Sequence, residues 1–265
     1  MPRIVALYRY PLKGFTPEPV QSLIIQPDGR VAGDRVLNLR FADAPVADGA
    51  WCRKYNGVVL ANTPGLARLR TRYDHQTRRL RIAQGERVLA DEEVTAAGRQ
   101  RIVDALTEYV MALDENPLQG HPERLPLKLV GDGVTPRYQD NEAGQVTLHS
   151  RETIASAAVA LGDTGLSDHR FRHNIVIEGV KAWEELSWLG RRVRIGNVLM
   201  EVVKLKTRCL ATHANPETGE RDLQVMQGLA GSFGQDQPTL GIGMLTRDAG
   251  GEVRIGDDIR VVGRA

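Results

Sequence analysis

Short strand-like segments separated by turn residues run through most of the chain, and they constrain its fold most strongly. Strands of this length, with turns between them, are typical of β-barrels and sandwiches. The segments that we expect to be strands are Ile4–Tyr10, Val20–Gln26, Val36–Phe41, Val58–Leu60, Leu66–Tyr73, Leu80–Ile82, Leu127–Val130, Val146–His149, Ile175–Glu178, Val193–Ile195, Val198–Leu205, Leu240–Leu245, Val253–Ile255 and Ile259–Val262.

Three other segments favour helices. Residues 92–113 repeat apolar side chains at helical spacing, and the prolines of residues 114–126 cannot continue that helix. The Ala-rich segment Glu152–Leu161 follows Ser150, a suitable N-cap, and Asp222–Leu229 fits a short helix. We therefore predict a β-rich mixed α+β fold with a few helices, a β-barrel core and an N-terminal barrel-like domain. The boundary falls in the Pro-rich stretch, giving domains 1–115 and 116–265 that share an interface and a site.

Composition excludes several classes of protein. The chain is 42% hydrophobic and 26% charged, and 35 basic against 33 acidic residues leave a net charge of +2. This charge gives no overall field for nucleic acid. No apolar stretch approaches the roughly 20 residues of a membrane helix, and the start lacks the apolar region of a signal peptide. We expect a cytoplasmic protein that binds neither nucleic acid nor membranes.

The chain has two cysteines, Cys52 and Cys209. Two thiols cannot build a four-thiolate zinc site or an iron–sulfur cluster, although one disulfide is arithmetically possible. Common nucleotide and zinc-protease motifs are absent, and Gly241-Ile242-Gly243 lacks the third glycine and the helix of a dinucleotide site. For Cys52 we favour a packing role.

Cys209 lies at the end of an expected strand, beside cations and before a Pro/Gly turn. A thiolate is a nucleophile or a soft metal ligand, and nearby cations favour its ionised form. The alternative is a half-buried cysteine that acts as a small hydrophobic residue. In a regular strand, Lys206 and Arg208 face away from Cys209. A bend, or a cation from elsewhere such as Lys13 or Arg172, is therefore needed.

Two further segments suit an anion. Arg170 and Arg172 flank Phe171 just before an apolar strand, and guanidinium groups bind phosphate bidentately. Lys13 and Gly14 follow the first strand and offer an ammonium and an unobstructed backbone N–H to one oxyanion. The alternatives are a solvated turn for the arginines and an ordinary surface position for the lysine.

These segments, in this order, resemble the MOSC family, the molybdenum cofactor sulfurase C-terminal-like domains. The resemblance is to the branch with an N-terminal β-barrel domain, which includes the mitochondrial amidoxime-reducing component and bacterial reductases of N-hydroxylated bases. The matching segments are Tyr10–Gly14 (family pattern Y-P-V/I-K-S), Gly33–Arg35 (G-x-x-x-D-R), Arg170–Ile177 (R-F-R-P-N), Thr207–Gly219 (R-C followed by P-x-T-G) and Gly251–Ile259 (a closing G-D strand pair). The chain departs from the family at Gly14, where serine is usual, and at His173, where proline is usual.

The resemblance implies a molybdenum cofactor, a molybdopterin with Cys209 as both the catalytic residue and the one protein ligand to molybdenum. The cofactor-binding residues that it implies, taken with the anion segments, are Lys13, Gly14, Arg35, Ser150, Arg170, Arg172, Asn174 and Arg208. It further implies an oxidoreductase that reduces small N-hydroxylated or N-/S-oxide compounds. Two cysteines leave no room for a resident cluster, so electrons are expected from a separate reductase or ferredoxin-type protein.

Two other functions stay open at this point. One is a non-catalytic carrier of molybdenum cofactor or sulfur, with Cys209 as the carrying thiol. The other is a cysteine hydrolase that pairs Cys209 with His213, which requires an oriented thiolate–imidazole pair. Metal analysis distinguishes the first of these from the enzyme.

Overall fold

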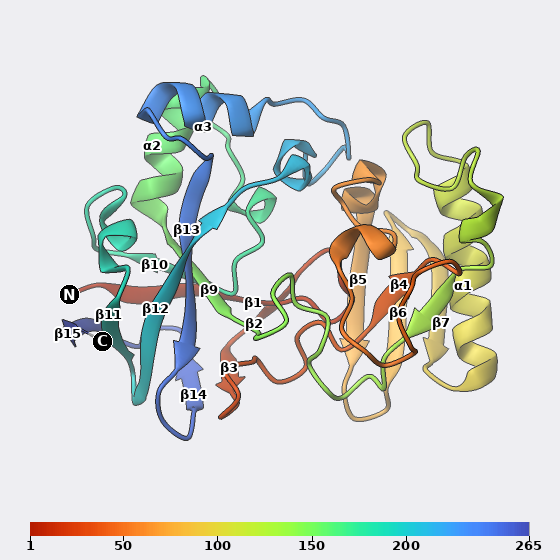
Figure 1. Cartoon of the computed structure of the whole chain (residues 1–265), viewed down its shortest axis with the longest axis horizontal. Coiled ribbons are helices and arrows are strands. Elements are labelled where there is room, and N and C mark those ends of the chain that lie inside the picture. The colour runs from red at the N-terminus through yellow and green to blue at the C-terminus, as the bar shows by residue number, and fades with distance from the viewer. Residues whose placement is uncertain (265) are drawn as a thin grey trace.

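The computed structural model describes residues 1–264, in which strands outnumber helices (Figure 1). The helices are α1 (Ala96–Met111), α2 (Arg151–Leu161) and α3 (Val225–Phe233). The strands are β1 (Arg3–Arg9), β2 (Glu18–Val20), β3 (Ser22–Ile25), β4 (Asn38–Arg40), β5 (Leu69–Asp74), β6 (Arg79–Gln84), β7 (Arg87–Glu93), β8 (Lys128–Val130), β9 (Val146–Ser150), β10 (Ile175–Glu178), β11 (Arg191–Ile195), β12 (Val198–Thr207), β13 (Thr239–Thr246), β14 (Gly251–Arg254) and β15 (Ile259–Arg264). The β-rich mixed α+β class is confirmed.

The larger part of the molecule is built on one mixed sheet, with strand order β15-β11-β12-β13-β9-β10-β1-β2. Leu148 in β9 is paired with Ile175 in the parallel strand β10 and with Ile242 in the antiparallel strand β13. These three side chains, together with Ile4 and Leu7 of β1, belong to one buried cluster. The N-terminal strand is therefore an interior strand of a sheet made mostly from the second half of the chain.

The sheet is not closed into a barrel, which corrects the sequence prediction. The residue before β15, Asp258, returns to β1 through an isolated bridge with Arg3. Further along the same edge, β1 is paired with β2 through Leu7, Tyr8 and Arg9. Because β2 already uses the donors and acceptors of this edge, β15 cannot extend its pairing along β1.

The smaller part contains a three-stranded antiparallel sheet, β5-β6-β7, and the short pair β4-β8. Helix α1 begins at its N-cap Thr95, whose Oγ1 accepts a hydrogen bond from the N–H of Gly98 at 3.1 Å. Its buried face includes Ile102, Leu106 and Val110, spaced as one stripe of a helix. These side chains join a second hydrophobic core that also contains Leu12, Phe15 and, from the far end of the chain, Ala214.

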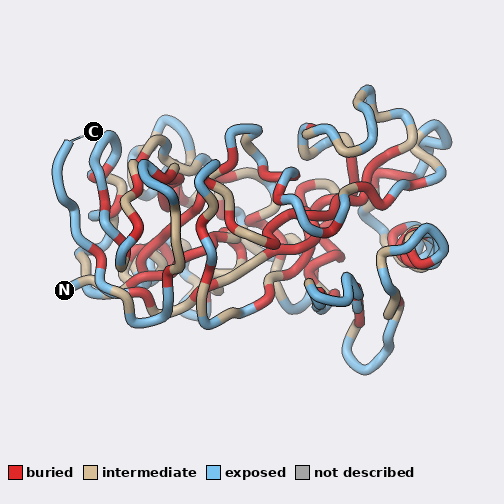
Figure 2. Tube along the Cα trace, turned by 90° about the horizontal axis from the view of Figure 1, so that it is seen from below, coloured by how far each residue is buried: buried red, intermediate tan, exposed pale blue. Residues whose placement is uncertain are grey.

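The two parts lie side by side along the long axis of the molecule (Figure 1), and buried chain runs through the middle of both (Figure 2). Helices α2 and α3 pack on each other through a third apolar cluster beside the large sheet. The division into domains 1–115 and 116–265 stays a prediction. Within residues 1–264, none of the helices is long and apolar enough to cross a membrane.

Several predicted elements differ from the structure. The helix expected over 92–113 is four residues shorter at its start, since β7 extends to Glu93 and Thr95 caps the helix. β7 itself was not predicted, and Val58–Leu60 is not a strand. The last helix is shifted from Asp222–Leu229 to Val225–Phe233, whereas Ser150 caps α2 as expected.

Candidate functional site

A cavity of about 260 Å³ lies where the segment after β1 meets the end of β12. Both parts of the molecule contribute to its wall. The lining side chains that matter below are Lys13, Gly14, Arg35, Lys54, Asp140, Gln145, Arg170, Arg172, His173, Lys204, Lys206, Arg208 and Cys209. Most of the residues predicted for the site are thus brought together from segments far apart in sequence.

Cys209 follows β12 directly and is partly exposed on the cavity wall. Register shifts between Val202 and Lys204, and between Leu205 and Thr207, break the alternation of β12. Bulges of this kind re-aim the side chains that follow them. Lys206 and Arg208 therefore line the same cavity as Cys209, although a regular strand would place them on the opposite face.

The cation that faces Cys209 comes from the other part of the molecule. Lys54 belongs to η1, a 3-10 turn over Lys54–Asn56. Burial alone lowers the pKa of Lys54, but the charge and hydrogen bonding of Cys209, with help from Asp140, raise it overall. The sequence analysis named Lys13 and Arg172 for this role and missed Lys54.

The cavity wall carries far more positive than negative charge. Its one lining carboxylate is Asp140, an exposed residue at the rim. Desolvation raises the pKa of Asp140, but Lys13, Arg35 and Lys206 together lower it to about 2. Burial and the neighbouring Arg208 lower the pKa of Lys206 to about 8. A wall whose cations repel one another in this way is suited to bind an anion.

Some of the predicted arginines are already bound to carboxylates. The Nη2 atom of Arg170 donates to both carboxylate oxygens of Asp222, at 2.7 and 3.0 Å. Arg35 forms an ion pair with Asp34, the residue before it. The guanidinium of Arg170 is therefore held mainly by protein groups, and the lysines remain as the more available cations.

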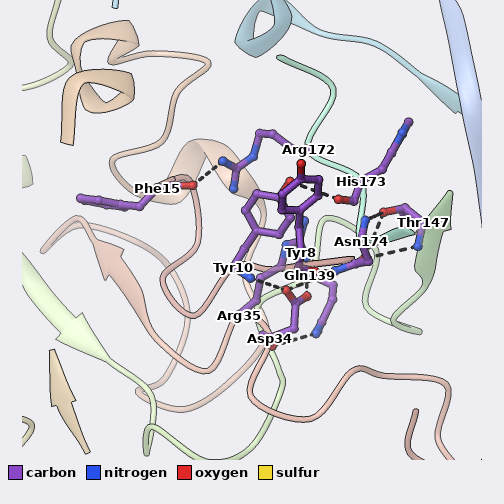
Figure 3. A network of polar contacts seen from close by, with 10 residues as sticks. All are labelled: Tyr8, Tyr10, Phe15, Asp34, Arg35, Gln139, Thr147, Arg172, His173 and Asn174. Carbon is purple, nitrogen blue, oxygen red and sulfur yellow. Dashed lines mark hydrogen bonds and ion pairs between the residues drawn. The ribbon is translucent and has the colours of Figure 1, made fainter. Parts of the chain in front are cut away.

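Tyr10 organises the arginine side of the cavity (Figure 3). Its buried ring contacts two guanidinium groups, with Arg172 at 4.4 Å and Arg35 at 4.9 Å from the ring centroid. Arg35 and Arg172 have φ angles of +52° and +57°, a region that arginine rarely adopts. Such strain persists only where surrounding contacts fix it, and it is common at functional sites.

Lys13 and Gly14 lie on the cavity wall. The Lys13 side chain is buried, and its Nζ donates to the carbonyl of Cys52 at 3.1 Å. Gly14 has a φ of +83°, and a Cβ atom there would lie 2.7 Å from Cα of Val59. The backbone around Val59 thus leaves no room for the serine that is usual in the family. Cys52 itself is buried against Val130 and Tyr138.

Asn174 and Ser150 do not line the cavity. The side chain of Asn174 joins Thr147 to Tyr8 and Asp34 (Figure 3). Ser150 Oγ accepts from the N–H of Thr153 at 3.1 Å and contacts the buried Glu185, which places it at the start of α2. Asn174 supports the cavity wall from behind through Thr147, a lining residue. The predicted contact of Asn174 and Ser150 with a cofactor remains a prediction.

His213 does not line the cavity that contains Cys209. Its Nε2 accepts a hydrogen bond from the N–H of Met226 at 3.2 Å, at the start of α3. A nitrogen used in this way is not available as a base. The arrangement gives no support to a cysteine hydrolase built from Cys209 and His213.

Several charged or titratable groups at or behind the cavity wall were missed, among them Lys54, Asp140, Lys206 and His149. Lys54 and Asp140 lie in loops, and Lys206 lies on a strand whose bulges reverse the expected side. His149 lies behind the wall on β9, with its Nδ1 2.7 Å from Nδ1 of His173. Of these residues, only His149 had a signal in the sequence, because its partner His173 stands where the family usually has proline.

Comparison with known proteins supports the family resemblance. Residues 135–260 match the family model of the MOSC domain. No match is found among curated proteins. Similar solved structures include the YUAD protein from Bacillus subtilis, which is 12% identical with a TM-score of 0.45, the alignment covering 98% of this chain and 94% of that one. YiiM from Geobacillus stearothermophilus is 17% identical with a TM-score of 0.32, over 44% of this chain and 53% of that one.

These structural likenesses are too distant to carry an argument about activity. The match to the family model is independent of them, and it covers β9 to the start of β15, including Cys209. Residues 135–260 therefore form a MOSC domain, as the sequence motifs in this part of the chain indicated.

Proposed function

We propose that this protein is a molybdenum-cofactor-binding oxidoreductase that reduces N-hydroxylated or N-/S-oxide compounds. The observation that carries the proposal is the cavity that combines Cys209 with a surplus of cations. MOSC domains bind molybdenum cofactor in some members of the family. A thiolate is the soft ligand that suits molybdenum, and cations suit the phosphate of a pterin.

The residues present fit such a cofactor. Within residues 1–264 no cluster of three or more His, Cys, Asp or Glu side chains could hold a metal ion by itself. Cys209 would therefore be a single protein ligand, as for a metal whose remaining ligands belong to its cofactor. Lys13, Lys54 and Lys206 would hold the anionic group, because their ammonium groups are less committed to carboxylates than Arg35 and Arg170.

The bound cofactor would supply the redox change and the oxygen-accepting centre, while the protein supplies the ligand, the orientation and the electrostatic field. Lys54 would place an ammonium group beside the sulfur of Cys209. Asp140, held as a carboxylate at the rim, would limit how strongly an anionic substrate is attracted. The electrons would come from a separate reductase or ferredoxin-type protein.

The test begins with protein purified from a host that makes molybdenum cofactor. We expect about one molybdenum per chain, release of a pterin on denaturation, and reduction of benzamidoxime or trimethylamine N-oxide with reduced methyl viologen as electron source. Cys209→Ser should lose metal and turnover. Cys52→Ala is the matched control, since Cys52 lies outside the cavity lining, and it should keep both.

Full turnover in Cys209→Ser would remove the proposal. Protein that carries a persulfide on Cys209, without molybdenum and without turnover, would instead indicate the sulfur-carrier function. Protein with bound cofactor but no turnover on either substrate class would indicate a cofactor carrier. Each result is distinguishable by combining metal analysis, mass spectrometry of the intact chain and the assay.

A further inference from the structure

Two histidines form a buried pair behind the cavity. His149 on β9 and His173 before β10 have exposed fractions of 1% and 2%. Their Nδ1 atoms are 2.7 Å apart, a hydrogen-bond distance. Gly241 on β13 makes room for the pair, since a Cβ atom there would lie 2.3 Å from Cε1 of His173. Strands β9 and β13 and the start of β10 thus fix the ring of His173, the residue that replaces the family's proline.

The neighbours of the pair determine where its protons are. Nη1 of Arg208 lies 3.2 Å from Nε2 of His173. A guanidinium can only donate, so Nε2 of His173 accepts and its proton is on Nδ1. That proton is donated to Nδ1 of His149, whose own proton is then on Nε2. This nitrogen points towards Oδ2 of Asp168, at 3.7 Å.

The row of hydrogen bonds from Arg208 through His173 to His149 cannot accept an additional proton without losing one of its hydrogen bonds. The two Nδ1 atoms share one proton, so a pair that carries one proton more must have hydrogens on both Nε2 atoms. The new hydrogen on His173 then faces the guanidinium of Arg208, and two donors repel each other. Burial first, and then Arg208 and His149, lower the pKa of His173 well below its ordinary value.

From this geometry we infer that His173 is a positioning residue, which holds Arg208 against the cavity wall beside Cys209 while His149 fixes its tautomer. The inference rests on the proposed function in one respect, namely that Arg208 acts on an anion in the cavity. Uptake of one proton by the pair releases Arg208 from His173. Arg208 is therefore held at the site only while the pair of His149 and His173 is neutral.

The charged surroundings favour the neutral pair at ordinary pH. Arg208, Lys206 and Arg35 all disfavour a further positive charge on His173. Asp168 is the acid that faces His149, and its side chain is 27% exposed and is also near His169. The hydroxyl of Tyr10 donates to the carbonyl of His173 at 3.2 Å, and burial keeps this phenol protonated.

The first experiment determines the tautomers directly. In protein labelled with ¹⁵N-histidine, long-range ¹H–¹⁵N correlation spectra at pH 7.5 should show His173 protonated on Nδ1 and His149 on Nε2. As the pH falls, both rings should change together in one protonation step, and the Nε–H signal of Arg208 should shift in the same step. A proton on Nε2 of His173 at pH 7.5, or two independent steps at ordinary histidine pKa values, would overturn the inference.

The second experiment measures how well the cavity holds an anion, with sulfate as the probe because its charge does not change in this pH range. At pH 7.5, His173→Leu should weaken sulfate binding roughly tenfold, since it removes the acceptor that fixes one charge-assisted donor. His173→Gln offers an amide oxygen to Arg208 and should stay within about threefold of the natural protein. Equal losses in both variants would count against positioning.

His169→Leu serves as the matched control, because His169 lies in the same loop but outside the lining of this cavity. It should leave sulfate binding unchanged. Neither experiment needs molybdenum. Correct tautomers and sulfate binding in a protein that never acquires the metal would contradict the proposed function alone, whereas wrong tautomers in a molybdenum-loaded protein would contradict this inference alone. If His173→Leu does not fold, the spectra of the unaltered protein still decide.

Discussion

At the scale of single residues, the cavity has two constraints: little space beside the backbone at Gly14, and more cations than anions among its lining side chains. Gly14 approaches the backbone of Val59 so closely that only glycine fits. Lys206 is surrounded by Arg208 and Arg35, which together with burial favour its neutral form. The second feature reduces the stability of the protein without a bound anion. Sites that bind strongly are often built at such a cost to stability.

The steric constraint predicts the effect of restoring the family's serine. Gly14→Ser should destabilise the fold by about 2–4 kcal/mol, because a left-handed φ and a clash with Val59 add together. Gly85→Ser is the control, since Gly85 also has a positive φ but would place its Cβ atom in open space. It should cost only about 1 kcal/mol. Urea unfolding measures both, and equal losses would show that the contact with Val59 is unimportant.

The surplus of positive charge predicts that Lys206 lowers the stability of the cofactor-free protein and strengthens the binding of an anion. Its pKa of about 8 lies below that of an unfolded lysine, so the unfolded chain binds more protons between these two values. The stability that this group contributes is present above the unfolded pKa and is lost as the pH falls through about 8. Lys206→Met should therefore stabilise the cofactor-free protein at pH 7 by on the order of 1–2 kcal/mol.

The same substitution should weaken sulfate binding at pH 7, because it removes one cation from the wall. Lys181→Met, at an exposed lysine outside the cavity lining, should change neither quantity. Urea unfolding at pH 7 and pH 10.5 gives the stability, and the gain should shrink at the higher pH. A gain of equal size at both pH values would mean that the lysine charge is not its cause.

At the scale of elements, the start of α2 depends on a buried acid from a different segment. Glu185 lies in η5, a 3-10 turn over Glu184–Trp188, and is fully buried. Its carboxylate accepts hydrogen bonds from the N–H and hydroxyl of Ser150 and from the hydroxyl of Thr153, at 3.1, 3.2 and 2.9 Å. An acid at the N-terminus of a helix also complements the helix dipole.

Removing this acid should loosen the helix without touching the cavity. Glu185→Ala is expected to cost about 2–4 kcal/mol, because it removes the carboxylate that accepts hydrogen bonds from three buried donors. Glu184→Ala is the control, since Glu184 is exposed and its side chain accepts one hydrogen bond, from the N–H of Lys181. It should cost no more than about 1 kcal/mol. Similar losses in the two variants would show that the network around Ser150 carries little stability.

The elements also show what the sequence could reveal. Apolar periodicity located α1, an Ala-rich segment located α2, and the N-cap at Ser150 was recognisable from its residue type. β7 was missed because Arg87–Glu93 is mostly charged and only Ala90 is buried, so it lacks the apolar alternation of a half-buried strand. The bulges in β12 have no sequence signal, and they decide that Lys206 and Cys209 share a cavity.

At the scale of the whole molecule, the site is made by bringing distant segments together. Motif resemblance found Cys209, Arg208, Arg172 and Lys13, since these lie in recognisable runs. It could not find Lys54, whose role depends on where a loop packs. Long-range contacts also join the two parts elsewhere. Trp51 Nε1 donates to the carbonyl of Gln139 at 2.8 Å, for example.

This shared construction predicts that the chain unfolds as one unit. β1 is an interior strand of the large sheet, so a fragment 116–265 would lose the partner of β10 and leave its buried edge unpaired. We expect urea unfolding followed by far-ultraviolet circular dichroism and by tryptophan fluorescence to give coincident transitions, because Trp51 and Trp188 report on opposite parts. Fragment 116–265 should be insoluble or unfolded when expressed alone, whereas fragment 1–115 supplied in the same cell should improve its recovery by restoring β1. Two separated transitions, or a well-folded fragment 116–265, would instead mean that each part is stabilised by its own core and that the cavity forms only when two independent domains meet.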